Sequence, residues 1–302
     1  IKSYVFVPAS NGIDFPKFKA GAHIDVVVAP GLVRQYSLCN SPEDENCYRI
    51  AVQCEPNGRG GSQRLHDTFA PGRSIQIGKP RNLFELQDTP EAMLFAGGIG
   101  ITPMLAMAWA LHRQGTPFEL HYCTATQGKW AFKDQWRDLP FVDNLHVYLD
   151  DDDSNTFNAE EVLQGHEQAG VYTCGPGGYM DYIERSVQAS DVPDGQFHKE
   201  SFVASSQQDA EKNKPFVVKL SQSGQEFAVP ADKSIVQVLN EAQVFIPVSC
   251  ENGVCGTCKC KVDAGEVDHR DMVLTDGERE QEQLFTPCVS RAKGSVLEIS
   301  GI

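Results

Sequence analysis

The sequence lacks the features that would place the protein in a membrane or on a nucleic acid. No segment contains about 18 consecutive apolar residues, so we expect no transmembrane helix. Basic residues are few, with 26 Lys and Arg against 41 Asp and Glu and a net charge of −15. Nucleic acids and anionic membrane surfaces both attract basic patches. The composition therefore argues against both kinds of partner.

The sequence also lacks a disulfide framework. Six of its ten cysteines are scattered without a pairing pattern, and no signal peptide is visible. Scattered thiols are typical of the reducing cytoplasm, where we expect the protein to reside. The first residue, Ile1, is not Met and reads as the middle of a strand, so we expect that preceding residues are missing. The six scattered cysteines are Cys39, Cys47, Cys54, Cys123, Cys174 and Cys260.

The other four cysteines have the spacing of a plant-type ferredoxin. Three of them follow the pattern C-x4-C-x2-C, and the fourth comes after residues 259–287. Four thiolates in this spacing bind a 2Fe–2S cluster. A zinc ribbon favours two C-x2-C pairs, whereas this chain has one, and a disulfide framework suits short secreted chains. We therefore predict as cluster ligands Cys250, Cys255, Cys258 and Cys288.

The residues between these cysteines suit a tight loop around a cluster. Gly253, Gly256 and Thr257 are small, so the loop can wrap closely and direct backbone N–H groups at the sulfurs. Cys260 alternates with Cys258 along the strand that leaves the loop. We therefore predict that Cys260 is not a ligand.

The pattern of apolar residues divides the chain into three domains. Residues 1–88 contain short alternating runs between Gly and Pro turns, which predict an antiparallel β-barrel. In residues 89–203, apolar strands alternate with helical stretches, which predicts a parallel sheet flanked by helices. Residues 204–215 are polar and read as a linker. Residues 216–302 combine a hairpin, a helix capped by Asp232 and the cysteine loop, which favours a β-grasp fold.

Two glycine-rich turns follow predicted strands of the parallel sheet. The first, in FAGGIGITPML, includes Gly97, Gly98 and Gly100. We expect Thr102 to cap the following helix and Pro103 to occupy its first position. The amides at such a helix start can bind a pyrophosphate, but a lone glycine turn is equally compatible with an ordinary tight turn.

The second turn, in VYTCGPGGYM, repeats this strand, turn and helix pattern. It comprises Cys174, Gly175 and Pro176. Ligands of open α/β sheets bind at the carboxyl ends of the strands. Two such turns on one sheet therefore predict a dinucleotide site.

The motif RQYS lies on a strand of the predicted barrel. Alternation places Arg34 and Tyr36 on one face of the strand and Gln35 and Ser37 on the other. The segment NGRGGSQRLHD then supplies a glycine turn and a short helix that opens at Ser62. Arg34 could be an ordinary surface residue, but together with the amides near Ser62 it could bind one phosphate group.

Several of these motifs occur in the same order in a known family. The chain contains RQYS, GRGGS, GGIGITPML, CGP, the tripeptide Glu200–Phe202, DHRDMVL, CVSRAK and the four-cysteine spacing. This set resembles the phthalate dioxygenase reductase family of the ferredoxin–NADP reductase-like superfamily. The resemblance covers the whole chain and implies an NADH-dependent oxidoreductase that transfers electrons through a flavin to a 2Fe–2S cluster.

The resemblance also implies roles for individual residues. It places a flavin on the barrel, with Thr102 near the flavin ring and Phe202 stacked on its face. Ser37 and Cys174 are implied as catalytic, Cys174 beside the nicotinamide during hydride transfer. The order of the domains implies FMN rather than FAD. The remaining implied flavin contacts are Arg34, Gln35, Tyr36, Ser37, Ala51, Val52, Gln53, Gly60, Gly61 and Ser62.

The sequence departs from the family in one place. Where similar NADH-dependent members carry an acidic residue for the ribose, this chain reads Thr124, Ala125 and Thr126. It also lacks an Arg in that turn that would bind a 2′-phosphate. NADH remains the expected electron donor.

The resemblance implies a terminal oxygenase as partner, more plausibly of the Rieske type than a haem protein, acting on aromatic compounds or as a demethylase. Two alternatives stay open. The chain could be the reductase portion of a self-sufficient haem-thiolate monooxygenase, or a non-catalytic iron–sulfur redox sensor. Five acidic residues between Asp271 and Glu282 could guide the ferredoxin domain to a basic patch of the oxygenase, or could simply form a solvated surface.

Overall fold

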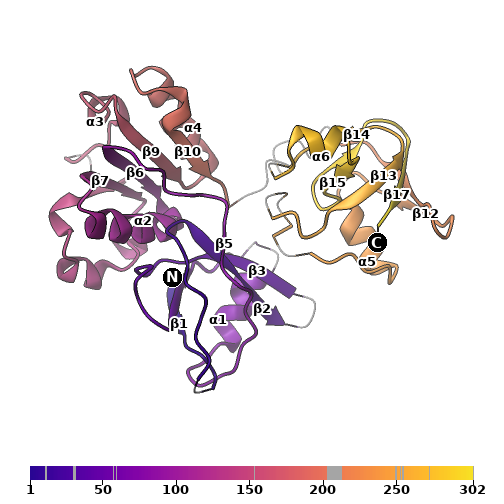
Figure 1. Ribbon diagram of the computed structural model, residues 1–302, viewed down its shortest axis with the longest axis horizontal. Helices are drawn as coiled ribbons and strands as arrows, with labels where there is room; N and C mark the ends of the chain where they lie inside the picture. Colours follow the sequence, from indigo (N-terminus) through magenta and orange to yellow (C-terminus); the bar gives the residue numbers. More distant parts are fainter. Residues whose placement is uncertain are drawn as a thin grey trace. The chain divides into compact units, whose positions relative to one another are not determined.

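The structure, a computed structural model, divides into two compact units, Ile1–Phe202 and Val203–Ile302 (Figure 1). Each unit is considered by itself. Most of the predicted linker, 204–215, lies outside the described residues. Those residues are 1–10, 12–29, 32–56, 58, 60–152, 154–202, 213–248, 250–251, 253, 255–271 and 273–301.

The first part of unit Ile1–Phe202 consists of antiparallel strands, as predicted for the barrel. Strand β1 pairs with β4, and β2 pairs with β3 and β5. Inward-facing residues of both sheets, including Ile24 and Ile50, share one apolar core, which helix α1 enters through Leu65. The elements are β1 (Lys2–Phe6), β2 (Ala22–Ala29), β3 (Leu32–Ser37), β4 (Tyr48–Val52), α1 (Gly61–Thr68) and β5 (Arg81–Asn82).

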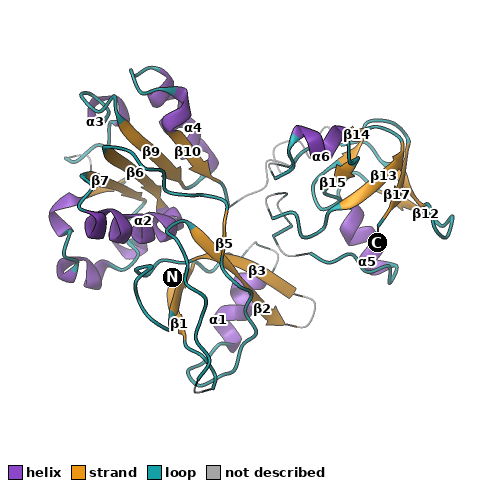
Figure 2. Cartoon of the chain, viewed as in Figure 1, coloured by secondary structure: helices purple, strands orange, loops and turns teal. Residues whose placement is uncertain are grey.

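The second part of this unit is a five-stranded parallel sheet in the order β10-β9-β6-β7-β8 (Figure 2). The central strand β6 is apolar on both faces because each face packs against a core: Leu94 belongs to one core and Phe95 to the other. The elements are β6 (Glu91–Gly97), α2 (Ile101–Gln114), β7 (Phe118–Thr124), β8 (Leu145–Leu149), α3 (Ala159–Val162), β9 (Ala169–Cys174), α4 (Gly177–Gln188) and β10 (Phe197–Glu200).

Short 3-10 helices connect these elements. They are η1 (Gly98–Gly100), η2 (Gln127–Lys129), η3 (Lys133–Asp138), η4 (Val142–Asn144) and η5 (Asp194–Gln196). The first of them, η1, runs directly into α2. The glycine turn after β6 is therefore already helical before α2 begins.

The C-terminal unit has a mixed sheet in the order β12-β11-β17-β13-β15 and a small sheet of β14 and β16. Strand β11 forms the predicted hairpin with β12 and runs parallel to β17. Helix α5 packs on the sheet through Ile235 and Leu239, as in a β-grasp fold. The elements are β11 (Phe216–Leu220), β12 (Glu226–Val229), α5 (Ile235–Glu241), β13 (Cys260–Ala264), β14 (Val267–Asp268), α6 (Asp276–Glu280), β15 (Leu284–Phe285), β16 (Arg291–Ala292) and β17 (Val296–Ser300).

The predicted start of α5 is wrong. Its N-cap is Ser234, whose hydroxyl accepts a hydrogen bond from the backbone N–H of Gln237. The side chain of Gln237 in turn accepts from the N–H of Ser234 at 2.8 Å. This reciprocal capping box holds two amides at once, so Ser234 rather than Asp232 begins the helix.

The predicted start of α2 is also wrong. Gly100 is the N-cap, and the helix begins at Ile101 because η1 continues into it. Thr102 lies inside the first turn, where its hydroxyl donates to the carbonyl of Ile99 at 3.1 Å. Pro103 is therefore the third helical residue and not the first. Helix α1 begins at Gly61, one residue before the predicted Ser62.

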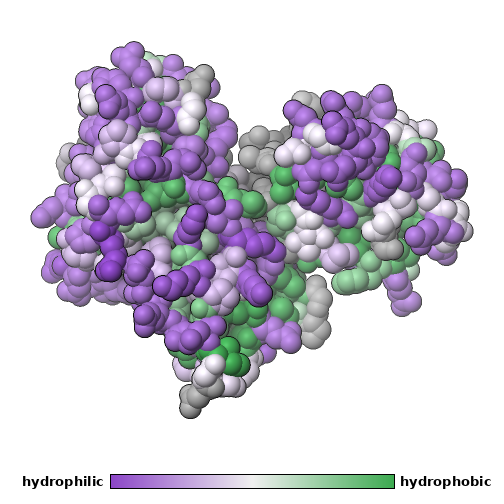
Figure 3. Space-filling model, in the orientation of Figure 1, coloured by the Kyte–Doolittle hydropathy of each residue, from purple (hydrophilic) through white to green (hydrophobic). Residues whose placement is uncertain are grey.

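None of the described helices is long and apolar enough to cross a membrane. Figure 3 shows hydrophilic residues over much of the visible face of both units. This surface agrees with a sequence in which 22% of the residues are charged.

Candidate functional site

Arg34 and the N-terminus of α1 come together as the sequence predicted. Gly60 has a φ of 74°, and α1 begins at the next residue. A Cβ atom on Gly61 would lie 2.7 Å from Cγ and from Nε of Arg34, so the arginine side chain crosses the start of the helix. The first amides of a helix lack intrahelical partners. Together with a guanidinium group they fit an anion such as a phosphate.

The end of β4 is held against the same helix. His66 Nε2 lies 2.8 Å from the carbonyl oxygen of Val52, and the N–H of Glu55 donates to Ser62 Oγ at 3.0 Å. Ala51 is buried like Val52, whereas Gln53 is exposed. The three residues Ala51, Val52 and Gln53 therefore lie next to the turn at Gly60–Ser62.

The two faces of β3 differ as alternation predicted. Tyr36 packs against the apolar core, and desolvation raises its pKa to about 12. On the other face, Gln35 Nε2 donates to Asp25 Oδ1 at 3.2 Å. Ser37, two residues further on, is buried. The polar side chains of Gln35 and Ser37 thus lie on the face of β3 opposite that of Arg34.

The two glycine turns of the parallel sheet are in direct contact. Strands β6 and β9 are parallel neighbours with Ala96 opposite Cys174. A Cβ atom on Gly100 would lie 2.1 Å from the carbonyl oxygen of Cys174, and one on Gly175 would lie 2.9 Å from Cα of Gly97. Only glycine fits at either position. The two turns form one surface at the carboxyl ends of the strands, where α/β sheets bind dinucleotides.

Tyr179 also contributes to this surface, and it was not among the predicted site residues. A Cβ atom on Gly97 would lie 2.9 Å from Tyr179 Cδ1 and equally close to Pro176 Cδ. The ring of Tyr179 comes from the first turn of α4 and covers the glycine turns. Its position in the motif GPGGYM is the signal that could have identified it.

A half-buried carboxyl group links the strand of RQYS to the CGP turn. Ser37 Oγ donates to Glu200 Oε2 at 3.5 Å, and Glu200 on β10 lies opposite Cys174 on β9. Desolvation raises the pKa of Glu200 to about 8 and the pKa of Cys174 well above its usual value. The Ser37 hydroxyl and the Cys174 thiol therefore both lie next to the carboxyl group of Glu200, whose raised pKa favours its protonated form at pH 7.

Sequence reasoning missed the role of Glu200, although it used the tripeptide that contains it. Phe202, two residues beyond, packs against the core of α2, β6 and β7. Thr102, expected near a flavin ring, is buried in the first turn of α2. The structure thus brings Ser37, Cys174 and Glu200 together.

The four predicted cluster cysteines come together in the C-terminal unit. Cys250, Cys258 and Cys288 are buried, and Cys255 is half-buried. Their sulfurs contact one another in two pairs: Cys255 hydrogen-bonds with Cys250, which lowers the pKa of Cys255, and Cys258 hydrogen-bonds with Cys288, which lowers the pKa of Cys258 and raises that of Cys288. Four cysteine sulfurs gathered in one loop region fit a 2Fe–2S cluster, which would bind them as thiolates.

The loop around these sulfurs has the predicted construction. The N–H of Thr257 points at Cys255 Sγ over 3.5 Å. Gly253 has a φ of 72°, and a Cβ atom there would lie 2.6 Å from Val289 Cγ2. Cys260 differs from the four ligands: its thiol donates to the carbonyl of Cys258, and desolvation raises its pKa to about 12. Cys260 is thus a core residue, and this geometry supports the prediction that it is not a ligand.

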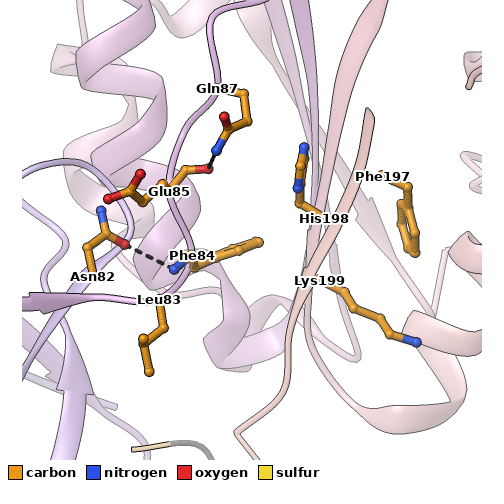
Figure 4. A pocket seen from close by; sticks show the side chains of 8 residues that line it. All are labelled: Asn82, Leu83, Phe84, Glu85, Gln87, Phe197, His198 and Lys199. Carbon is orange, nitrogen blue, oxygen red and sulfur yellow. Dashed lines mark hydrogen bonds between the residues drawn. The ribbon is translucent and has the colours of Figure 1, made fainter. Parts of the chain in front are cut away.

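A pocket of about 460 Å³ lies elsewhere in unit Ile1–Phe202 (Figure 4). Its walls come from the segment after β5 and from β10, and none of the predicted site residues lines it. It is therefore not the predicted flavin or nucleotide site. The lining residues are Asn82, Leu83, Phe84, Glu85, Gln87, Phe197, His198 and Lys199.

The fold and these sites define an electron-transfer oxidoreductase. Residues 218–293 match the family of 2Fe–2S iron–sulfur cluster binding domains. The chain is 42% identical over 300 residues to the vanillate O-demethylase oxidoreductase of Pseudomonas sp. strain HR199, covering 98% of this chain and 94% of the relative.

Two solved structures extend the comparison. A phthalate dioxygenase reductase matches with a TM-score of 0.77 and 39% identity, covering 99% of this chain and 92% of that chain. An intact self-sufficient monooxygenase of the haem-thiolate cytochrome type matches with a TM-score of 0.76 and 34% identity, covering 98% of this chain but 38% of that one.

The chain belongs to the phthalate dioxygenase reductase family. This membership confirms the predicted multidomain fold and the predicted class of enzyme, the reductase component of an oxygenase system. The cofactor set of FMN, NADH and a 2Fe–2S cluster is that of the family.

Proposed function

We propose that the protein passes electrons from NADH through FMN and its 2Fe–2S cluster to a terminal aromatic oxygenase or demethylase of the Rieske type. The observation that carries this proposal is the meeting of Ser37, on the strand of RQYS, with Glu200 and Cys174 at the glycine turns. A flavin bound on that strand and a nicotinamide bound at those turns would lie next to each other.

On the flavin side, Arg34 and the amides of Gly60, Gly61 and Ser62 hold the phosphate. FMN carries a single phosphate, which one such cradle can hold. The strand residues contact the ring and the ribityl chain: these are Gln35, Tyr36, Ser37, Ala51, Val52 and Gln53, with Thr102 and Phe202 near the ring. Flavin released by heat is expected to run as FMN in chromatography.

On the nicotinamide side, Gly97, Gly98 and Gly100 together with Gly175 and Pro176 hold the pyrophosphate. Cys174 and Ser37 position the ring. Hydride transfer requires the reacting atoms to be held roughly 3–3.5 Å apart, and it requires no general acid or base. A bound flavin would supply the link between a two-electron hydride donor and a one-electron acceptor such as the cluster. Protonated Glu200 adds no negative charge beside the hydride path.

The charges near the turn expected to contact the adenosine ribose of the dinucleotide support NADH over NADPH. The turn after β7, Thr124–Thr126, contains neither Asp nor Glu and no Arg. The structure adds an acidic neighbour, Asp150, the residue after β8, whose backbone N–H donates to the carbonyl of Thr124 at 3.1 Å. A carboxylate beside this turn would repel a 2′-phosphate.

Each domain predicted from the sequence is assigned one cofactor or connecting role. Residues 1–88 bind the flavin, residues 89–203 bind NADH, residues 204–215 connect the units, and residues 216–302 carry the cluster. The cytoplasm is the proposed compartment because all ten cysteines are free and the cluster needs reduced thiols.

The Rieske-type partner is supported by the higher identity to the reductase of a demethylase system than to the haem-thiolate monooxygenase. The test mixes the protein and NADH with the purified oxygenase component of a vanillate demethylase or, separately, with a haem-thiolate monooxygenase domain. Substrate-dependent NADH consumption, with matching product, is expected with the Rieske protein. Electron delivery to the haem protein alone would contradict the proposal.

A further inference from the structure

Three side chains of ligand type meet on two strands at one edge of the parallel sheet. Glu119 and His121 are two residues apart on β7, so both point to the same face. His146 lies opposite His121 on the edge strand β8. They belong to none of the flavin, nucleotide or cluster sites described above, and any ligand they hold is separate from the proposed electron transfer.

The ligand atoms are spaced as a metal ion would require. Glu119 Oε2 lies 3.1 Å from His121 Nε2 and 3.5 Å from His146 Nε2. All three atoms lie within 4.8 Å of one another. A tetrahedral zinc ion with bonds of about 2.0–2.2 Å separates its ligand atoms by about 3.3–3.6 Å. Only small movements would therefore bring the three atoms onto one ion.

The surroundings of His121 prepare its Nε2 atom to act as a ligand. Its side chain is 3% exposed, and its ring stacks on that of Phe95 at 5.4 Å between centroids. Its other nitrogen, Nδ1, lies 3.0 Å from the hydroxyl of Tyr148. A hydrogen bond at Nδ1 fixes the tautomer of a metal-binding histidine and orients its ring.

The other two ligands keep the position open to solvent. The side chains of Glu119 and His146 are 42% and 40% exposed, so an ion can enter and His146 can turn toward it. A single histidine–carboxylate pair would be a simpler arrangement, and the same sheet contains one: His166 Nδ1 lies 3.0 Å from Glu91 Oε2. The second imidazole at Glu119 is what distinguishes this cluster.

We propose that Glu119, His121 and His146 bind one divalent transition-metal ion of the class of Zn²⁺. Two imidazoles and one carboxylate are a ligand set that this class prefers, and they leave room for water on the ion. The bound ion would fasten the edge strand β8 to β7.

The test uses the full-length protein with its cofactors and Zn²⁺ as the probe. Equilibrium dialysis followed by elemental analysis gives the Zn²⁺ bound per chain, and calorimetry gives the affinity. His146→Gln and Glu119→Gln replace exposed ligands and are expected to remove one bound Zn²⁺ or weaken it by at least about tenfold. His166→Gln, which breaks the simpler pair on the same sheet, should bind Zn²⁺ as the natural protein does.

A thermal measurement supplies a second readout. Zn²⁺ should raise the unfolding temperature of the natural protein and of His166→Gln, and this rise should be smaller in His146→Gln because ligand binding stabilises the folded state. The proposal is overturned if all variants bind the same amount of Zn²⁺ with the same affinity. It is also overturned if the natural protein retains no more Zn²⁺ than His146→Gln.

Discussion

At the scale of single residues, the ten cysteines differ in their contacts with other sulfurs and in the pKa of their thiols. Cys288 contacts Cys258 within the set of four, whereas Cys260 is a protonated thiol in the core. Cys288→Ser should therefore abolish the visible absorbance of the cluster but preserve NADH oxidation with ferricyanide, which the flavin can reduce directly. Cys260→Ser should change neither. Loss of the cluster in Cys260→Ser, with a retained cluster in Cys288→Ser, would show that the ligand set is wrong.

Glu200 predicts a pH dependence of stability. Its folded-state pKa of about 8 lies above the ordinary value of 4.5. Between these values the unfolded chain loses the proton while the folded protein keeps it, so the free energy of unfolding falls as pH rises. Glu200→Gln has nearly the shape of the protonated carboxyl group but does not ionise, so it removes this pH-dependent contribution to the free energy of unfolding. The variant should gain stability relative to the natural protein between pH 5 and pH 8.

Thermal unfolding of the two proteins, followed by release of flavin fluorescence, measures this difference. A relative gain of about 1 kcal/mol would raise the unfolding temperature of the variant by about 2–4 °C at the higher pH. Glu184→Gln is the control, since Glu184 pairs with Lys199 at 2.7 Å at the surface. A constant difference between natural protein and Glu200→Gln at every pH would exclude an ionisable carboxyl with a raised pKa.

At the scale of elements, strands were predictable and helix starts were not. Strands β6 and β9 are largely apolar runs, the first ending at Gly97 and the second followed directly by Gly175, and this pattern appears directly in the sequence. The start of α5 depends on a choice between two capping residues in the segment Asp232–Ser234. Asp and Ser cap equally well, so backbone angles decide. The Gln three residues after Ser234 was the available signal.

The site at Glu200 depends on pairing between distant elements. Its hydroxyl partner, Ser37, is 163 residues away in the sequence. Its thiol neighbour lies opposite it only because β10 pairs with β9 in one particular register. No local pattern encodes this register. The four cysteines, in contrast, are mostly within one loop, so their spacing alone predicted the cluster.

The capping box of α5 gives a prediction at this scale. Ser234→Ala removes the acceptor for the N–H of Gln237 and should lower the free energy of unfolding by about 0.5–2 kcal/mol. Urea denaturation of the full chain, followed by loss of cluster absorbance, measures it. Asp232→Ala is the control and should change stability by less than about 0.5 kcal/mol. An equal loss in both variants would contradict the assignment of the cap.

At the scale of the whole molecule, the negative charge is distributed differently from what the sequence suggested. The segment 216–302 contains 13 acidic and eight basic residues. Of the five acids from Asp271 to Glu282, however, Asp271 is buried and pairs with Arg279 at 3.3 Å. Glu278 caps α6 through Thr275 and pairs with Lys259. The exposed acids of this segment are Asp276, Glu280 and Glu282.

These three exposed acids are the ones that can guide the cluster domain to a basic surface of an oxygenase. Such guidance weakens as salt shortens the Debye length to about 8–10 Å near physiological ionic strength. Electron transfer to the oxygenase should therefore slow as salt rises, whereas ferricyanide reduction by NADH should change much less. Glu278 is left intact in the test because its removal would also break the capping box of α6 and the pair with Lys259.

The combined variant Asp276→Asn, Glu280→Gln, Glu282→Gln should flatten the salt dependence of electron transfer to the oxygenase, measured by stopped flow between low and physiological salt. The matched control, Glu226→Gln, Asp232→Asn, Glu266→Gln, removes the same charge from exposed positions elsewhere in the unit and should keep most of that dependence. If both variants flatten it equally, the net charge of the unit attracts the oxygenase and no particular surface does. If neither does, the acids around α6 are a solvated surface, and the contact with the oxygenase depends on apolar or hydrogen-bonding groups.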